Sequence, residues 1–312
     1  MDINDKIYVA GHTGLIGSAI LRRLKEAGYN NLLFMRHQDL DLTNSNAVDL
    51  FFDTHRPLYV FLAAGRVAGI RANILKPADF ISINIGIQLN VLKAAHRVNV
   101  YKLILFGSSC MYPRDCIQPM SEALLMSGKP EQTSLPYAIS KLAGLHMCLA
   151  YNQQYKVQRF IPVIPNTAYG PNDNFNSDSG HVIPALLTRF DEARRNGSKS
   201  LTLWGSGEAR REFIHADDVA DACLTILVSN TKELELPINL GTGTDISISE
   251  LAEVVARVVK YKGNIKWDLS KPEGAKKKLL DSSRLREFGW APKVNLEEGI
   301  RQTYNWYIKN SL

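Results

Sequence analysis

The chain has 312 residues, which is enough for one large domain or two modest ones with a substantial hydrophobic core. Hydrophobic residues make up 45% of the chain and charged residues 22%, a balance typical of a soluble globular protein. The formal net charge is +6, but Lys and Arg are scattered rather than gathered in one arm. The composition therefore suits an anionic small-molecule ligand and argues against a nucleic-acid partner.

The four cysteines have neither the spacing of a metal site nor that of a disulfide framework; they are Cys110, Cys116, Cys148 and Cys223. We therefore expect reduced thiols and no bound metal. We recognise no signal peptide and no apolar run long enough to span a bilayer. A cytoplasmic location without a membrane partner is the resulting expectation.

A glycine-rich turn near the N-terminus lies between a short apolar run and a segment with helical periodicity. Residues 6–10 have the length of a buried parallel strand, and residues 18–28 read as a helix that stops at a glycine. The turn between them reads Gly11-His12-Thr13-Gly14-Leu15-Ile16-Gly17. Glycines at this spacing let the backbone approach a pyrophosphate, which the N-terminus of the next helix attracts. The pattern predicts a dinucleotide-binding unit.

Further apolar runs predict the other strands of one sheet, at 31–35, 58–64, 103–106 and 157–163. Helical segments alternate with them at 44–55, 73–98 and 137–155, and a late strand and turn at 237–243 is expected to rejoin the sheet. This alternation indicates an α/β fold with a doubly wound parallel (Rossmann) sheet. Because ligands bind at the carboxyl ends of such strands, we expect the glycine turn, Ala63-Ala64-Gly65 and Gly107 to Cys110 along one edge.

Proline and glycine become frequent from Pro162 onward, which marks a change of organisation. We predict that residues 1–170 form the dinucleotide-binding domain and that 238–260 return to it. Residues 171–237 and 261–312 are predicted to form a smaller C-terminal α/β domain that binds the substrate.

The second strand ends at Arg36, where a dinucleotide fold places the residue that discriminates between cofactors. An acid at this place accepts the ribose hydroxyls of NAD, whereas an arginine pairs with the 2′-phosphate of NADP. Arg36 therefore favours NADP, although an exposed loop arginine near Asp39 and Asp41 is the competing interpretation. Asp41 lies in the stretch expected to flank the adenine.

Tyr137 and Lys141 are four residues apart, so on a helix they share one face. An ammonium that close favours the phenolate, and we expect it to lower the pKa of Tyr137 from its usual value of about 10. Ser108 follows the predicted strand at 103–106 and has a hydroxyl expected to reach the same substrate oxygen as Tyr137. Behind a dinucleotide fold, this group indicates proton transfer near neutral pH.

In this order, the glycine turn, Ser108 and the Tyr137–Lys141 pair resemble the extended short-chain dehydrogenase/reductases that act on nucleotide sugars. Longer stretches resemble the GDP-L-fucose synthase family, and the similarity extends over nearly the whole chain. They are Ala10 to Ile20, Phe106 to Pro113, Tyr169-Gly-Pro-Asn-Asp-Asn-Phe175, His181 to Leu187, Trp204 to Gly207, Arg211-Glu-Phe-Ile-His215 and Lys278 to Asp281.

The resemblance implies a bifunctional enzyme that uses NADPH to convert GDP-4-keto-6-deoxy-D-mannose to GDP-L-fucose. It would epimerise C3 and C5 and then reduce the C4 ketone. The ketone acidifies the hydrogens on both neighbouring carbons, so epimerisation needs a base and an acid on opposite faces of the ring. By resemblance Cys110 is the base and His181 the acid, and the usual pKa values of a thiol and an imidazole, about 8.5 and 6.5, bracket neutral pH.

The resemblance also implies the roles of other residues. Ser108 and Tyr137 would hydrogen-bond the oxyanion at O4, Tyr137 would deliver the proton, and Lys141 would hold the ribose hydroxyls. The implied nucleotide-sugar contacts are Ser108, Ser109, Cys110, Arg189, Trp204, Arg211 and Lys278. The implied cofactor contacts are residues 11–17, Arg36, Asp41, Ala63, Ala64, Gly65, Gly107, Ser108, Tyr137, Lys141, Pro165, Asn166, Thr167, Ala168 and His181.

A homodimer is also implied, through helices at 85–98 and 137–155. The apolar residues Leu142, Leu145 and Leu149 allow such an interface, but the same stripe would equally suit packing on the protein's own sheet.

The chain departs from the family's pattern at three places. Thr13 stands where the family often has an arginine that holds the adenosine of NADP. Asn166-Thr167 replaces the usual Thr-Asn order, and Lys276-Lys277 replaces Pro-Arg. Because the last two places border the nicotinamide and substrate sites, a GDP-4-keto-6-deoxy-heptose is an alternative substrate.

Three other functions compete with this interpretation. A dehydratase of the superfamily usually carries an Asp-Glu pair where this chain has Ser109-Cys110. A reductase without epimerisation would not need Cys110 and His181. A non-catalytic dinucleotide sensor typically lacks the Tyr or the Lys of the pair, and this chain has both.

Overall fold

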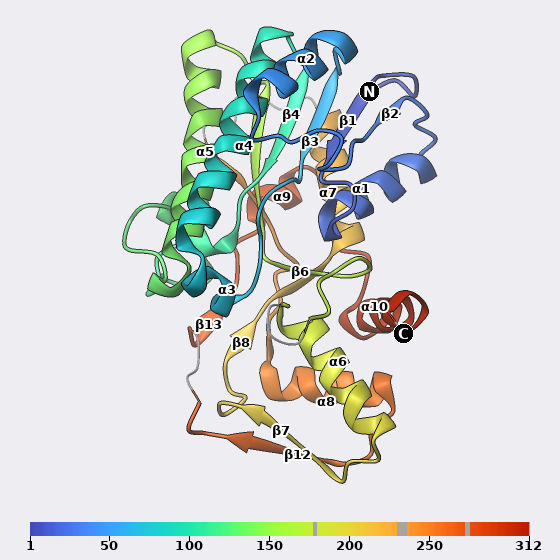
Figure 1. The fold of residues 1–312 in the computed structure, drawn as a ribbon. Coiled ribbons are helices and arrows are strands. Elements are labelled where there is room, and N and C mark those ends of the chain that lie inside the picture. Colours follow the sequence, from blue (N-terminus) through green and yellow to red (C-terminus); the bar gives the residue numbers. More distant parts are fainter. Residues whose placement is uncertain (177–179, 230–235, 272–274, 312) are drawn as a thin grey trace.

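The computed structural model describes residues 1–176, 180–229, 236–271 and 275–311 (Figure 1). Its centre is a six-stranded parallel sheet with the strand order β10-β5-β4-β3-β1-β2. The strands are β1 (Ile7–Ala10), β2 (Leu32–Leu33), β3 (Tyr59–Leu62), β4 (Lys102–Phe106), β5 (Phe160–Pro165) and β10 (Ile238–Leu240). The order reverses between β1 and β3, so the predicted doubly wound sheet is confirmed.

Both faces of the sheet are covered by helices. Neighbouring residues of a strand point to opposite faces, and here the residues on both faces are apolar and need cover. In β1, Ile7 and Val9 belong to the core cluster that contains residues of α1 and α7, whereas Tyr8 and Ala10 belong to the cluster on the other face. The covering helices are α1 (Leu15–Glu26) and α7 (Ala216–Val228) on the first face, and α2 (Ser45–His55), α4 (Pro77–Arg97) and α5 (Leu135–Tyr155) on the second.

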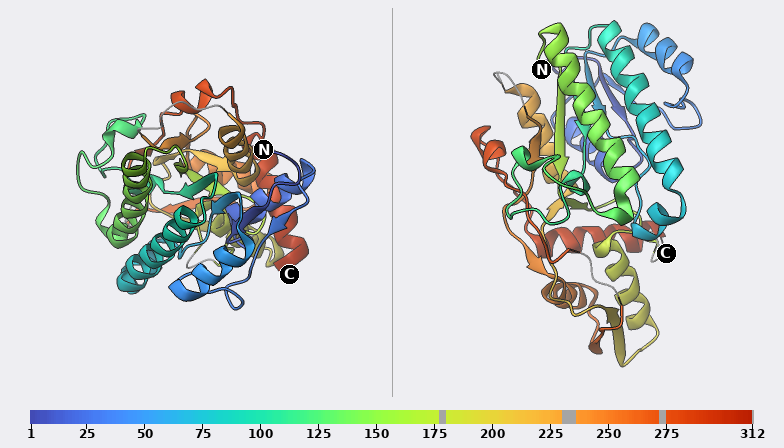
Figure 2. Two further views of the ribbon diagram at one scale, coloured as in Figure 1. Left: turned by 90° about the horizontal axis from the view of Figure 1, so that it is seen from above. Right: turned by 90° about the vertical axis from the view of Figure 1, so that its left-hand side faces the viewer.

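Helices α4 and α5 run side by side along the second face (Figure 2). They approach closely at Gly144, where a Cβ would lie 2.2 Å from the side-chain oxygen of Gln88. The apolar stripe of α5 faces inward: Leu142 and Leu145 are buried in a cluster with Met111, and Leu149 packs against it. The stripe that also suited a dimer interface is therefore part of the chain's own core.

A smaller region below the sheet in Figure 1 is built around α6 (Val182–Arg195), α8 (Ile248–Val259) and α10 (Leu296–Ser311). Its strands form small sheets: β7 (Ser200–Trp204) with β12 (Asn264–Asp268), and β8 (Arg210–Arg211) between β11 (Ile246–Ser247) and β13 (Lys277–Lys278). The pair of β6 (Thr167–Tyr169) and β9 (Phe213–His215) lies where the chain passes between the two regions. The short elements are α3 (Ile70–Leu75), α9 (Ser283–Glu287), and the 3₁₀ turns η1 (Ser109–Met111), η2 (Glu122–Leu124) and η3 (Gln132–Ser134).

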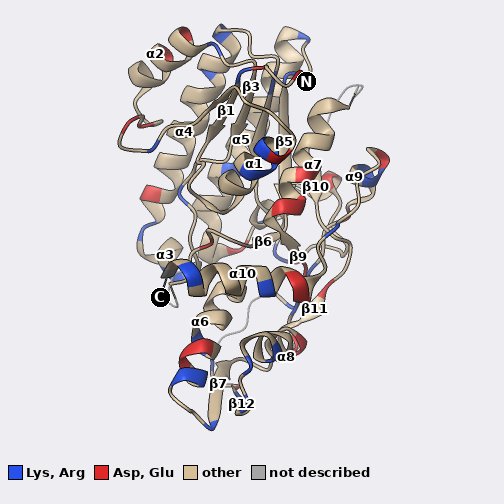
Figure 3. Cartoon of the chain, turned by 90° about the vertical axis from the view of Figure 1, so that its right-hand side faces the viewer, with Lys and Arg blue, Asp and Glu red and all other residues tan. Residues whose placement is uncertain are grey.

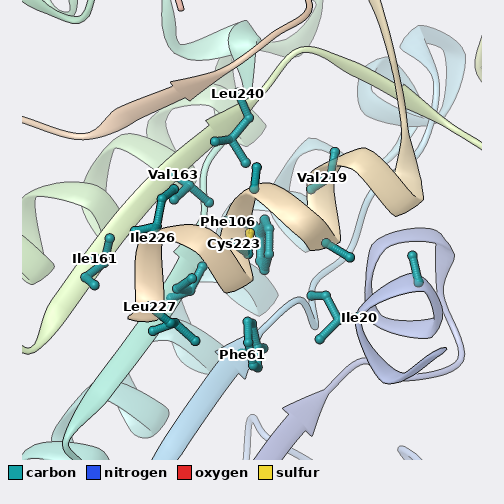
Figure 4. Packing of buried hydrophobic residues seen from close by; sticks show 14 of the residues in the cluster. Ile20, Phe61, Phe106, Ile161, Val163, Val219, Cys223, Ile226, Leu227 and Leu240 are labelled. Atoms are coloured by element: carbon teal, nitrogen blue, oxygen red, sulfur yellow. The ribbon is translucent and has the colours of Figure 1, made fainter. Parts of the chain in front are cut away.

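Two helices pack differently from the division drawn from the sequence. Helix α7 falls in the segment 171–237, yet Cys223 and Ile226 pack among Phe61, Phe106 and Val163 of the central sheet (Figure 4). Within 238–260, β10 does join that sheet, but α8 packs with α6 and α10 in the smaller region. The reason is physical: an apolar stripe predicts that a helix buries one face, but it does not say against which partner.

Charged side chains of both signs are interspersed over both regions (Figure 3). Some of them join segments far apart in the chain, since Arg22 and Arg23 of α1 form ion pairs with Asp217 and Asp221 of α7. Among the described residues, no helix has the length and apolarity needed to cross a membrane.

Candidate active site

The glycine turn connects β1 to α1 at the point where the strand order reverses. Gly11 has a φ of +82°, and a Cβ at Gly17 would lie 2.1 Å from the carbonyl oxygen of Gly11, so neither position accepts a side chain without strain. Helix α1 begins after Gly14 with no side-chain cap and no acidic residue in its first turn. Its first amides are therefore available to an anion, and these residues fit the pyrophosphate of a dinucleotide.

The end of β2 lies against this turn through an aromatic contact. The ring centres of His12 and Phe34 lie 5.0 Å apart. Phe34 is exposed and was not among the site residues predicted from the sequence. Burial and the charge of Arg36 lower the pKa of His12, and a hydrogen bond with the backbone of Met35 acts against the fall. Asp41 instead accepts hydrogen bonds from the backbone and the hydroxyl of Thr43, at 2.9 and 2.8 Å.

Ser108, Cys110 and Tyr137 come together beyond the end of β4. Ser108 begins the turn η1, and its hydroxyl accepts a hydrogen bond of 3.3 Å from the amide of Cys110. Tyr137 lies in the first turn of α5 and is 7% exposed. Burial raises the pKa of Tyr137 above its usual value, Cys110 adds to the rise, and a hydrogen bond with Ser108 opposes it.

The buried ammonium of Lys141 points to the backbone of β4. It donates a hydrogen bond of 2.9 Å to the carbonyl oxygen of Phe106, and it lies 5.9 Å from the centre of the Tyr137 ring. Burial lowers the pKa of Lys141 to about 8. The expectation of a lowered pKa for Tyr137 is wrong for this structure, because burial of the phenol raises that pKa.

The carboxyl ends of β3 and β4 also meet at this edge. A Cβ on Gly65 would lie 2.8 Å from the side-chain oxygen of Asn84 and 3.6 Å from the Lys141 nitrogen. Gly11, in turn, would place a Cβ within 2.8 Å of the backbone of Ala63 and Ala64. The residues expected along one edge of the sheet are therefore close neighbours in the structure.

Asn166, directly after β5, is held by a buried carboxylate. Its side-chain amide donates to Glu212, which lies between β8 and β9 and is fully buried. Glu212 also accepts from the amides of Gly243, at 2.7 Å, and Leu280, at 2.9 Å. Burial raises the pKa of Glu212, and these hydrogen bonds act against the rise. Glu212 was not among the site residues predicted from the sequence, although it lies in the recognised motif Arg211 to His215.

The predicted substrate contacts occupy two places in the smaller region. Arg211 and Lys278 are direct partners in the β8–β13 pair, and burial lowers the pKa of Arg211. Arg189 on α6 donates a hydrogen bond of 2.5 Å to the carbonyl of Thr202 in β7, the strand that ends at the exposed Trp204. Within the described part of the chain, no hydrogen bond or ion pair joins Arg211 or Lys278 to Arg189 or Trp204.

His181 is the residue that precedes α6, and its Nδ1 atom lies 3.7 Å from a carboxylate oxygen of Asp173. No hydrogen bond among the described residues joins His181 to Ser108, Cys110 or Tyr137. Asp173 belongs to the motif Tyr169 to Phe175 but was not selected from the sequence. An acidic residue inside an otherwise polar and aromatic motif was the available signal.

The glycine turn lies where the strand order reverses, and Ser108, Tyr137 and Lys141 lie at the end of β4. This arrangement defines a dinucleotide-binding enzyme of the α/β class. Residues 7–241 match the model of the NAD dependent epimerase/dehydratase family, and the chain belongs to that family.

Known proteins resemble the chain over nearly its full length. It is 48% identical to GDP-L-fucose synthase 1 of Arabidopsis thaliana, over 99% of this chain and 95% of that protein. It is 44% identical to the GDP-L-fucose synthase of Escherichia coli (strain K12), over 98% and 97% of the two chains. The solved structure of a GDP-mannoheptose C4 reductase from Campylobacter jejuni with NADP bound has a TM-score of 0.89 and 37% identity, and covers 99% of both chains. The resemblance to the GDP-L-fucose synthase family is confirmed.

Proposed function

We propose that the protein is an NADPH-dependent 3,5-epimerase and 4-reductase that converts GDP-4-keto-6-deoxy-D-mannose to GDP-L-fucose. The observation that carries the proposal is the junction of Ser108, Cys110 and Tyr137 at the end of β4, with Lys141 one turn further along α5. The identity of 44–48% with GDP-L-fucose synthases over almost the whole chain supports the same assignment.

The cofactor is NADPH, which supplies the hydride when it is bound. The backbone of Gly11 to Gly17 and the uncapped start of α1 would hold its pyrophosphate. Arg36 would pair with the 2′-phosphate, in keeping with the effect of its charge on His12. Lys141, beside Gly65, would hold the ribose hydroxyls, and Asn166 would be fixed at the nicotinamide side by Glu212.

Proton transfer would be divided among four side chains. Cys110 removes a proton from the carbon next to the ketone, and His181 returns one on the opposite face of the ring. Ser108 and Tyr137 hydrogen-bond the oxygen at C4 while negative charge develops on it. The raised pKa of Tyr137 keeps the phenol in its protonated form at neutral pH, so that it delivers its proton when the ketone is reduced.

The GDP part would bind in the smaller region. Arg211 and Lys278 lie side by side across two paired strands and present two positive charges to the diphosphate. Arg189 and the exposed Trp204 would contact the nucleoside, since an open aromatic face suits stacking on a base or sugar.

The protein would act in the cytoplasm as a homodimer. The outer side of the α4–α5 layer still exposes apolar side chains, among them Leu89 and Ile139, after the inner stripe of α5 has been used in the core. Pairing of this layer with its copy across a two-fold axis would cover them. Analytical ultracentrifugation of the wild type and of Leu89→Glu tests the interface.

A related GDP-4-keto-6-deoxy-heptose is the second candidate substrate. The 37% identity with the GDP-mannoheptose C4 reductase favours it, but the identity with the fucose synthases is higher. Kinetics with both sugars under the same conditions distinguish them, because the better substrate has the higher kcat/KM.

The decisive experiment follows the product by NMR after incubation with GDP-4-keto-6-deoxy-D-mannose and NADPH in heavy water. We expect GDP-L-fucose that carries deuterium at C3 and C5. Reduction without deuterium would indicate a simple reductase, and the absence of NADPH oxidation with either sugar would contradict the proposal. Tyr137→Phe is the control, because it removes the proton donor and should abolish reduction while the fold is kept.

A further inference from the structure

Asp173 has a buried carboxylate, and only one of its two oxygens has a hydrogen-bond partner among the described residues. The side chain is 3% exposed. Its Oδ1 atom accepts a hydrogen bond of 2.7 Å from the amide of Asn174, whereas Oδ2 is buried and finds no partner in the part of the chain that the structure describes. A carboxylate oxygen that is removed from water without a donor costs free energy, so a nearby donor is expected to be used.

The imidazole of His181 lies close to this carboxylate. Its Nδ1 atom is also buried and, among the described residues, without a hydrogen-bond partner. It lies 3.7 Å from Oδ1 of Asp173, and a carboxylate oxygen with two lone pairs can accept this donor in addition to the amide of Asn174. The side chain as a whole is 37% exposed, so the exposure belongs to the rest of the ring. The distance is longer than a hydrogen bond, and an approach of about 1 Å would form one.

The backbone keeps these two residues opposite each other. The Asp173 amide donates to the carbonyl of Gly170 in a turn after β6, and His181 has extended backbone angles directly before α6. The hydroxyl of Thr188 on α6 donates a hydrogen bond of 3.0 Å to the carbonyl of Phe175, two residues after Asp173. This bond connects the stretch that contains Asp173 to the helix that follows His181. The pairing of carboxylate and imidazole is therefore built into the start of α6.

We propose that Asp173 is a positioning residue for His181: its carboxylate holds the proton on Nδ1 and leaves Nε2 as the atom that exchanges a proton with the sugar. The inference rests on the proposed function, in which His181 is the acid of the epimerisation. A histidine that donates one ring N–H to a carboxylate has a fixed tautomer and a fixed ring orientation.

The proton balance is complete with this arrangement. The thiolate of Cys110 accepts the proton that leaves the carbon, and the imidazolium gives its Nε2 proton to the carbon from the other face. After that transfer the neutral ring keeps its Nδ1 proton on the Asp173 carboxylate. Solvent then restores the proton on Nε2 and removes the one on the thiol, so no other reactant is needed.

The test compares Asp173→Asn and Asp173→Ala with the wild type. We expect deuterium incorporation next to the ketone to fall by about 10- to 100-fold in Asp173→Ala, the range found when the hydrogen-bond partner of a metal-bound histidine is removed. The fall should be smaller in Asp173→Asn, whose amide oxygen can still accept from Nδ1. The dissociation constant of NADPH and the thermal midpoint of Asp173→Asn should change little, because the amide oxygen still accepts from Asn174. A combined loss of folding and NADPH binding in both variants would overturn the proposal in favour of a purely structural role.

A double-mutant cycle shows whether Asp173 acts through His181. The variant Asp173→Ala/His181→Gln should be no slower than His181→Gln alone, whereas losses that multiply would contradict the proposal. Asp217→Asn is the matched control, since Asp217 also lies 3.7 Å from the Nδ1 atom of a histidine, His215. It should leave deuterium incorporation unchanged, and an equal loss there would overturn the assignment to Asp173.

A measurement on the imidazole itself separates this proposal from the proposed function. Nitrogen-15 NMR should show the Nδ1–H tautomer of His181 in the wild type and its loss in Asp173→Ala. If the wild type incorporates no deuterium, the proposed epimerisation fails, and the tautomer still decides the role of Asp173. The Nε2–H tautomer in both proteins would overturn it.

Discussion

The ammonium of Lys141 is buried against the carbonyl oxygen of Phe106, 2.9 Å away at the carboxyl end of β4. Burial lowers the pKa of Lys141 to about 8, because removal from water disfavours the charged form. One neutral hydrogen-bond acceptor does not compensate for the lost hydration. The protein therefore keeps a charge in its core that is costly for stability, at a place where the proposed function needs a cation.

This cost predicts a pH-dependent stability difference between the wild type and Lys141→Met. The folded pKa, about 8, is lower than the value of 10.5 for a lysine in water, so the unfolded chain binds more protons between these pH values. The stability of the wild type should therefore rise with pH across this window relative to the variant, which lacks the titrating group. Urea unfolding from pH 7 to 10.5 measures it, and a constant difference would refute the argument.

A second prediction concerns the space around Gly17. A methyl group there would lie 2.1 Å from the carbonyl oxygen of Gly11, so Gly17→Ala must displace the turn and should destabilise the fold by about 1–3 kcal/mol. NADPH binding should be lost with it. In Gly14→Ala the new methyl would lie 3.5 Å from the same oxygen, an ordinary contact, so this control should lose far less stability. Thermal unfolding and NADPH fluorescence measure both effects, and equal losses in the two variants would contradict it.

The sheet and the glycine turn were predictable because their signals are local. The apolar runs have the length of buried strands. The glycine spacing before a helix start can be recognised within a few consecutive residues, and the structure gives Gly11 the positive φ that such a turn needs. The order Ser108, Tyr137, Lys141 was informative for the same reason, since two of these residues share one helix face.

Contacts between distant segments were not predictable from the same patterns. Glu212 reaches Asn166, which is 46 residues away, and nothing in either stretch specifies the other. The raised pKa of Tyr137 has the same origin, because burial depends on the packing of several elements rather than on the spacing to Lys141. The placement of α7 on the sheet and of α8 in the smaller region was not predictable for the same reason. The sequence shows that each helix has an apolar face but not which element that face packs against.

Cofactor choice should depend on Arg36, because Thr13 has no charge to assist it. The loss of a charge-assisted hydrogen bond to the 2′-phosphate costs about 1.5–3 kcal/mol, which corresponds to a rise of roughly 10- to 100-fold in the dissociation constant. Arg36→Ser should show this rise for NADPH and almost none for NADH in fluorescence titrations. Arg301→Ser on α10 is the control, and equal losses for both cofactors would argue against a 2′-phosphate contact.

Glu212 should connect the two binding regions, because its carboxylate accepts from the Asn166 side chain and from the amides of Gly243 and Leu280. The amide of Gly243 donates to one carboxylate oxygen and the amide of Leu280 to the other, while the Thr242 hydroxyl lies 3.4 Å from the first. Whichever oxygen the NH2 group of Glu212→Gln replaces, it would turn its own donors towards one of these two backbone amides. An unsatisfied buried group costs about 1–3 kcal/mol, and we expect that loss in urea unfolding.

Glu212→Gln should weaken the binding of both NADPH and the GDP-sugar. Asn166 lies on the dinucleotide side, and Leu280 follows Lys278, the proposed diphosphate contact in β13. We therefore expect a higher dissociation constant for NADPH and a higher KM for the GDP-sugar, whereas the exposed Glu208→Gln should change neither. A stability loss without any change in the two affinities would restrict Glu212 to the fold. A loss of only one affinity would place the effect on that side of the carboxylate alone.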